Sequence, residues 1–113
     1  MDAQPGPHDI ISGNLVYDNA QLVPTDGFGA ITDGEGIILD TNPGYTGGIL
    51  VQNNTVSGNG GPGIESFLTD NATITGNTVH GNNTQNTQAP SNAEMFINQS
   101  NNNTVTPGPT ATS

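Results

Sequence analysis

Short apolar runs recur along the chain, and segments rich in asparagine and glycine separate them. Three ten-residue segments, 10–19, 50–59 and 73–82, superpose without gaps. Each has a β-branched aliphatic residue at its second position and asparagine at its fifth and tenth positions. The seventh position is valine in all three segments. Apolar residues that alternate with polar ones in such short runs predict β-strands, and their repetition predicts a stack of similar units.

A second motif lies between these copies. Residues 34–37 (GEGI) match residues 61–64 (GPGI), and residues 93–97 (AEMFI) take the corresponding place in the third unit. In a fourth, broken copy, Val105 takes the place of Ile74. Each unit is therefore expected to hold two short apolar strands joined by turns.

The spacing of the copies is uneven. Asn54 and Asn77 are 23 residues apart, whereas Asn14 and Asn54 are 40 apart. We therefore expect loop insertions near 21–33 and near 84–92.

Strands of about four to six residues are too short to be stable as isolated hairpins, so each unit needs a neighbour. Stacking places each strand beside its copy at the parallel-sheet spacing of roughly 4.8 Å, and aliphatic side chains then share an interior column. We expect the aligned asparagines to adopt left-handed turn geometry and to hydrogen-bond from unit to unit. The pattern predicts an all-β solenoid of about three coils over residues 1–106, with a flexible tail at 107–113.

The repeats are similar to those of a known family. Residues 33–40 (DGEGIILD), 50–56 (LVQNNTV) and 60–64 (GGPGI) resemble the repeats of bacterial parallel β-helix proteins of the pectate-lyase superfamily. The resemblance covers roughly residues 8–106. That superfamily includes polysaccharide lyases, polygalacturonase-like hydrolases and alginate epimerases. The resemblance implies a right-handed parallel β-helix, a single-stranded solenoid, that handles a polysaccharide and is secreted or held at the cell surface.

The chain also departs from the family pattern. Family members have many more coils and an N-terminal capping helix, whereas this sequence has about three coils and no amphipathic cap. Both ends of the stack are therefore expected to expose strand edges, which pair readily with other chains. Two interpretations follow: the chain is a piece of a longer protein, or chains pair end to end as a homo-oligomer.

The net charge of the chain argues against some classes of binding partner. The chain has ten acidic residues, no lysine and no arginine, which gives a net charge of −10 at pH 7. We therefore expect no binding to nucleic acid and none to an anionic membrane surface, since both need cations. A lyase that uses a lysine or arginine base is excluded within this segment. We find no secretion signal, no run of residues long enough to cross a membrane and no cysteine.

Strand alternation predicts a candidate catalytic pair. In the expected register, Glu65 and Glu94 point outward one coil apart, and Phe67 and Phe96 lie two positions along, beside Asp40. Paired carboxylates suit glycoside hydrolysis, because one protonates the leaving oxygen while the other acts as nucleophile or base. We therefore expect Glu65 and Glu94 to be catalytic, with pKa values that are driven apart by their proximity. We expect Asp40, Phe67 and Phe96 to bind the substrate.

A second acidic group surrounds the first loop and consists of Asp26, Asp33, Glu35 and Asp40. Oxygen-rich acidic loops suit a hard cation such as Ca²⁺, so Asp33, Glu35 and Asp40 are candidate calcium ligands. The sequence has no EF-hand spacing and no calcium-binding nonapeptide array. Ordinary turn carboxylates are the alternative interpretation.

The sequence leaves two classes of function open. The first is a carbohydrate-active module that binds or cleaves a polysaccharide, with Tyr45 also stacking on a sugar ring. The second is a structural or adhesive β-solenoid segment of a larger surface protein, whose outward carboxylates are solvated charges. The register of the third coil decides between them, since a slip of one residue reverses the face that a side chain occupies.

Overall fold

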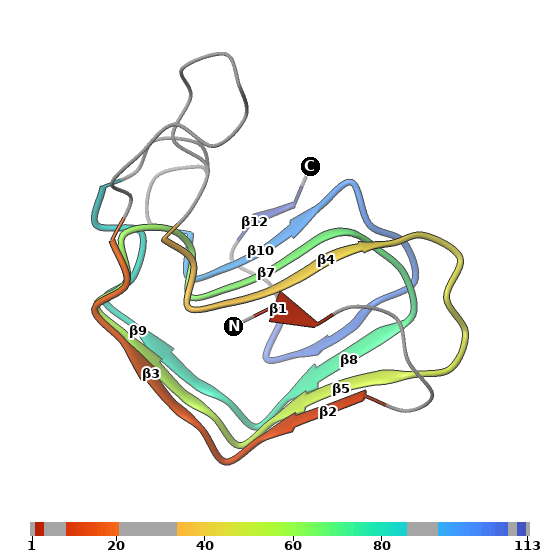
Figure 1. Ribbon diagram of the computed structural model, residues 1–113, viewed down its shortest axis with the longest axis horizontal. Coiled ribbons are helices and arrows are strands. Elements are labelled where there is room, and N and C mark those ends of the chain that lie inside the picture. Colours follow the sequence, from red (N-terminus) through yellow and green to blue (C-terminus); the bar gives the residue numbers. More distant parts are fainter. Residues whose placement is uncertain (1, 4–8, 21–33, 86–92, 109–110, 113) are drawn as a thin grey trace.

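The computed structural model describes residues 2–3, 9–20, 34–85, 93–108 and 111–112. Within these ranges the chain has β-strands and no helices, and every strand pair is parallel. The strands form three sheets, which lie around a shared interior (Figure 1). The predicted all-β class with parallel strands is confirmed, and the arrangement is compatible with a parallel β-helix or solenoid.

Each sheet takes one strand from each successive unit. Sheet A has the order β1 (Asp2–Ala3), β4 (Ile37–Asn42), β7 (Ile64–Thr69), β10 (Met95–Asn98) and β12 (Ala111–Thr112). Sheet B has the order β11 (Thr104–Thr106), β8 (Ala72–Thr75), β5 (Ile49–Gln52) and β2 (Asp9–Ser12). Sheet C has the order β3 (Leu15–Tyr17), β6 (Thr55–Ser57) and β9 (Thr78–His80). From β2 to β10 the chain visits sheets B, C and A in turn.

The strand register confirms the alignment of the repeats. In sheet B the Cα partners are Ile11, Val51, Ile74 and Val105. In sheet C they are Val16, Val56 and Val79, and in sheet A Ile37 pairs with Ile64. Residues at one position of the repeat therefore lie directly above one another.

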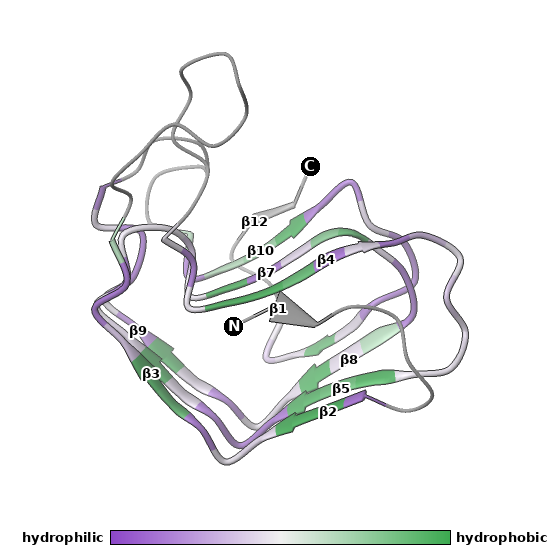
Figure 2. Cartoon of the chain, viewed as in Figure 1, coloured by the Kyte–Doolittle hydropathy of each residue, from purple (hydrophilic) through white to green (hydrophobic). Residues whose placement is uncertain are grey.

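The aligned aliphatic side chains form one core to which all three sheets contribute. Leu39, Val51, Val56 and Ile64 are fully buried, and Val79 packs against them. Hydrophobic residues follow the strands in Figure 2, while hydrophilic residues gather at the corners. Each unit buries the apolar residues of its neighbour, which explains how strands of three to six residues are held.

The second glycine of the GEGI and GPGI motifs lets the chain enter sheet A close to sheet C. A Cβ atom on Gly36 would overlap the side chain of Val56, and one on Gly63 would overlap the side chain of Val79. Each glycine therefore lies against the strand of sheet C in the following unit. A larger residue fits here only where that strand is absent.

Two asparagine ladders hold the corners on either side of sheet C. In the first ladder, Asn54 Oδ1 accepts hydrogen bonds from N and Nδ2 of Asn14 at 2.9 and 3.0 Å. Asn77 Oδ1 accepts the same pair from Asn54 at 3.0 and 2.9 Å. In the second ladder, Asn19 donates to Asn59, and Asn59 donates to Asn82, with the same geometry. The expected hydrogen bonding between stacked asparagines is confirmed.

The left-handed turn residues are not these asparagines but the residues just before them. Positive φ angles occur at Gly13, Asn53 and Gly76 in the first corner, and at Asp18, Gly58 and Gly81 in the second. Our expectation that the aligned asparagines supply the left-handed geometry is therefore wrong. Glycine, asparagine and aspartate tolerate that backbone, whereas the aligned asparagine is needed for its side chain.

The ends of the sheets differ. Sheet A ends in the two-residue strands β1 and β12, and β12 pairs with β10 through Phe96–Ala111 and Ile97–Thr112. Residues 111–112, which lie in the segment expected to be a flexible tail, therefore add a strand to sheet A. Among the described residues, sheet B ends at β2 and β11, and sheet C ends at β3 and β9. The prediction that chains pair end to end is not tested by this arrangement.

Candidate functional site

Two rows of side chains cross sheet A on the face opposite the core. Ile38, Glu65 and Phe96 are Cα partners in the first row. Asp40, Phe67 and Asn98 are partners in the second row, two residues further along the strands. We call these six residues the sheet A face. They alternate with the core residues of β4, β7 and β10.

Glu65 occupies the centre of the sheet A face, on the middle strand. Only 3% of the residue is exposed. Its Oε1 atom accepts a hydrogen bond from Asn98 Nδ2 at 3.1 Å, whereas its buried Oε2 atom receives no hydrogen bond from a donor in the described residues. A buried carboxylate oxygen without a donor is costly, so this environment favours the neutral acid.

The carboxyl group of Glu35 lies within hydrogen-bonding reach of Glu65. Burial is the main cause that raises the pKa of Glu65 from 4.5 to about 7, while the hydrogen bond from Asn98 acts in the opposite direction. The charges of Glu35 and Asp40 raise the pKa further. Two carboxyl groups in contact cannot both ionise cheaply, so the pair shares one proton near neutral pH.

The predicted pairing of Glu65 with Glu94 is wrong. In sheet A, Glu65 pairs with Phe96, and Met95 takes the place of Ile64, so the third coil is shifted by two residues from the expected register. Glu94 precedes β10, and its carbonyl oxygen accepts a hydrogen bond from Ile64 N at 3.1 Å. Glu94 is therefore not one of the paired residues that make up the sheet A face.

Glu94 instead ends the second asparagine ladder. Its carboxylate accepts hydrogen bonds from N and Nδ2 of Asn82, with Oε2 at 3.1 and 2.8 Å. These are the two donors that each earlier asparagine of the ladder gives to the next one. The carboxylate therefore stands where the amide oxygen of a further asparagine would be.

The same geometry explains why a glutamate is tolerated at this position. Ile37 N donates to Gly63 O, just as Ile64 N donates to Glu94 O, so Glu94 takes the place of a motif glycine. Gly36 and Gly63 each lie against the next strand of sheet C. Among the described residues no strand follows β9 in sheet C, and this leaves space for a side chain.

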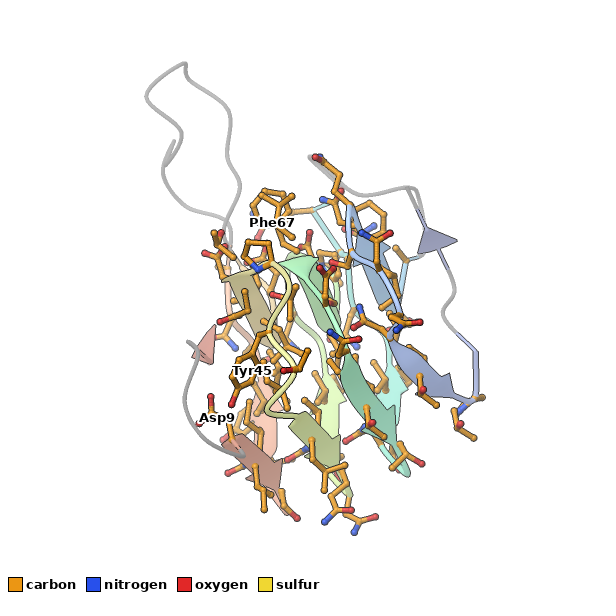
Figure 3. The ribbon with its side chains drawn as sticks, turned by 90° about the vertical axis from the view of Figure 1, so that its right-hand side faces the viewer. Asp9, Tyr45 and Phe67 are labelled. Carbon is orange, nitrogen blue, oxygen red and sulfur yellow. The ribbon has the colours of Figure 1, made fainter. Side chains whose placement is uncertain are left out.

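The predicted aromatic residues lie in three different places. Phe67 pairs with Asp40, as expected, and is partly exposed. Phe96 lies beside Glu65 rather than beside Asp40, and it is buried against Ala93. Tyr45 lies in the turn between β4 and β5, where it packs against the core and meets Gly47. In Figure 3 the side chain of Tyr45 lies apart from Phe67, between it and Asp9.

The calcium hypothesis gains no support among the described residues. Asp26 and Asp33 lie outside the described ranges. Glu35 and Asp40 both lie near Glu65, but the structure shows no group of three or more acidic, histidine or cysteine side chains arranged to hold a metal ion within those ranges. The prediction that Asp33, Glu35 and Asp40 bind Ca²⁺ stays a prediction.

Sequence reasoning missed the role of Glu35 as the partner of Glu65. Glu35 aligns with Pro62 in the repeat, and this replacement of proline by a carboxylate is the only signal in the sequence. It also missed Asn98, which takes the place of Asp40 and Phe67 in the third unit.

An apolar groove of about 290 Å³ lies on the outer face of sheet B. Its lining residues are Asp9, Ile10, Gly48, Ile49, Leu50 and Thr73. Ile10 is 63% exposed there, and the Oδ2 atom of Asp9 is buried without a hydrogen-bond partner in the described residues. This groove lies on a different sheet from the paired carboxyl groups.

No protein-family model, curated protein or solved structure matches this chain. The resemblance to the pectate-lyase superfamily therefore depends on the repeat motifs alone. Over the described ranges, no helix is long and apolar enough to cross a membrane.

Proposed function

We propose that this chain is a right-handed parallel β-helix module, secreted or held at the cell surface, that binds a polysaccharide along the sheet A face and cleaves it by acid catalysis. The observation that carries the proposal is the contact between the carboxyl groups of Glu35 and Glu65, where burial raises the pKa of Glu65 to about 7. A carboxyl group that is still protonated near neutral pH is what a general acid requires.

The two carboxyl groups have different roles in this proposal. Glu65 is buried, so it acts as a positioning residue that keeps the shared proton in the pair. Glu35 is half-buried and is the member that meets the sugar. It delivers the proton to the leaving glycosidic oxygen, which supports departure of that group.

Asp40 supplies a second carboxylate. It lies on the sheet A face, two residues beyond Ile38, the Cα partner of Glu65. In this proposal Asp40 accepts the proton of the attacking water, and Phe67 beside it offers an apolar surface to the sugar ring.

The test is incubation of the chain with a panel of polysaccharides, followed by measurement of new reducing ends and of retention on each polymer. We expect Glu35→Gln to abolish turnover. Glu65→Gln should lower turnover and move the high-pH limb of the activity profile to lower pH, because it removes the carboxyl group whose pKa is raised. Asp18→Asn is the matched control, since it removes an exposed carboxylate from the corner after sheet C. Absence of both product and retention with every polymer would defeat the proposal.

A non-catalytic structural or adhesive β-solenoid is the second candidate. The position of Glu94 favours it, because this glutamate serves the asparagine ladder rather than a catalytic pair. In that case Glu35→Gln and Glu65→Gln would leave every functional readout unchanged. Circular dichroism of both variants is needed to show that the fold is retained.

A further inference from the structure

The two ends of the stack differ in the side chains that they expose. Among the described residues, the exposed large hydrophobic side chains all lie in the first unit, on β2 and β3, which are edge strands (Figure 3). They are Ile10, Leu15 and Tyr17, with exposed fractions of 63%, 66% and 58%. The third unit has threonine in place of Ile10 and Leu15 and histidine in place of Tyr17. Apolar side chains beside unpaired strand edges indicate a surface for association.

The hydrogen bonds of the asparagine ladders run in one direction along the stack. Each ladder asparagine that has a counterpart in the next unit donates to its Oδ1 atom through N and Nδ2. Asn14 and Asn19 donate in this way, but their own Oδ1 atoms receive no hydrogen bond from the described residues. The first unit therefore presents two acceptor oxygens, one at each corner beside β3. A partner that continues the stack here must bring N–H donors to both corners.

The opposite end of this chain does not complement the first unit. There the donors of Asn82 are already bonded to the carboxylate of Glu94, so the second ladder ends on an acceptor. The strand edges do not match either. Strand β11 pairs with β8 and so lies one unit beyond β9. The β2 and β3 strands of a second copy belong to one unit and cannot pair with β11 and β9 together. A second copy that offers its own first unit brings the same two acceptor oxygens.

We propose that the open edge of β2 and β3 is a docking surface for one coil of a different polypeptide, a parallel β-coil with asparagine at both corners. The docked coil continues the parallel pairing that β5 and β6 make on the other side of β2 and β3. Its two asparagines donate to the Oδ1 atoms of Asn14 and Asn19. Aliphatic side chains of the coil beside Ile10 and Leu15 remove these residues from water. This inference depends on the fold alone and not on catalysis at the sheet A face.

The probe for this surface is a synthetic peptide of residues 49–59 (ILVQNNTVSGN) with blocked termini. It contains the sequences of β5 and β6, and Asn54 and Asn59 supply the corner donors. It has no charged residue, so the net charge of −10 on the chain does not repel it. Titrated into the full chain, it should shift the amide NMR signals of β2 and β3 in a saturable manner. The signals of β9 and β11 should not move.

A variant peptide and two variants of the chain test the contacts separately. The peptide with both Asn54→Ala and Asn59→Ala should bind about tenfold more weakly, because it lacks the side-chain donors at both corners. Ile10→Thr and Leu15→Thr should each weaken binding of the original peptide about fivefold. Both variants introduce the residue that the third unit has at the same position, so the fold is expected to be retained. Thr104→Ala, an exposed change on β11, is the control and should leave the affinity unchanged.

Three results would overturn the inference. The first is the absence of any shift in β2 and β3 at millimolar peptide concentrations. The second is equal binding of the peptide without its asparagines, since the corner oxygens would then not select the partner. The third is association of the chain with itself that Ile10→Thr and Leu15→Thr abolish, because the occupant of the edge would then be a second copy.

Discussion

The asparagine ladders and the sheet A face both bury polar side chains, but only the ladders pair them fully. In the ladder, Asn54 receives two hydrogen bonds through Oδ1, and its Nδ2 atom donates to Asn77 and to Ile11 O. On the sheet A face, Glu65 is equally buried, yet one of its oxygens receives no hydrogen bond from a described donor. Buried polar groups that are fully paired specify a structure, whereas an incompletely paired one identifies a place where a proton or a ligand is expected.

The largest expected effect on stability comes from a mutation in the first asparagine ladder. Asn54→Ala removes the partner of Asn14 and leaves the Oδ1 atom of Asn77 without one of its donors. Each buried group left unpaired costs about 1–3 kcal/mol, so we expect the free energy of unfolding to fall by about 4 kcal/mol. Urea denaturation measures this loss. The control is Thr55→Ala, an exposed neighbour that should change stability by less than about 0.5 kcal/mol; a similar loss in both would remove the distinction.

The sheet A face should instead make stability depend on pH. Burial raises the pKa of Glu65 from 4.5 to about 7, so the native state keeps a proton that the unfolded chain releases. The favourable contribution is fully present below pH 4.5 and is lost as the pH rises through about 7. The loss is about 3 kcal/mol if the unfolded value is the ordinary one. Urea midpoints across this range should decline for the native chain.

The matched variant for this pH dependence is Glu65→Gln, which cannot ionise. Its unfolding free energy should vary much less between pH 4.5 and 7, and it should exceed that of the native chain above neutrality. A native chain whose stability is flat over this range would contradict the shared proton.

A smaller effect on stability is expected at Glu94, where the second asparagine ladder ends. Glu94→Gln keeps an oxygen acceptor for Asn82 but removes the negative charge. Hydrogen bonds to a charged acceptor are stronger than neutral ones, so we expect a loss of about 1 kcal/mol in the unfolding free energy. Glu94→Ala should lose more, since both donors of Asn82 are then unpaired. An activity assay on Glu94→Gln should show normal turnover. Loss of turnover with normal stability would instead indicate that Glu94 has a catalytic role.

The smallest effect is expected at Asp70, outside both regions. The backbone N–H groups of Gly44 and Asn101 donate to its carboxylate and hold its pKa below the usual value. The carboxyl group is exposed, so solvent screens these bonds. Asp70→Asn should leave the urea midpoint within error near neutral pH. A large loss would show that this turn contributes as much stability as the ladders.

The local repeats allowed most of the fold to be predicted. Ile11, Val51 and Ile74 could be aligned because each fills the core at the same position of its own unit. The structure pairs them as aligned. The third coil of sheet A could not be placed in the same way. There Glu94 takes the place of the motif glycine, so the sequence signal that aligned β4 with β7 is missing.

The sequence by itself determined that strands are short, that equivalent residues stack and that the stacked asparagines hydrogen-bond, because these follow from a repeated local pattern. Tertiary structure alone decided which carboxyl group faces which. Glu35, which precedes β4, lies near Glu65 on β7, and the carboxylate of Glu94 bonds to Asn82. A shift of two residues in one strand moves a side chain to a different row without changing the apolar pattern, so hydrophobic periodicity carries no information about it.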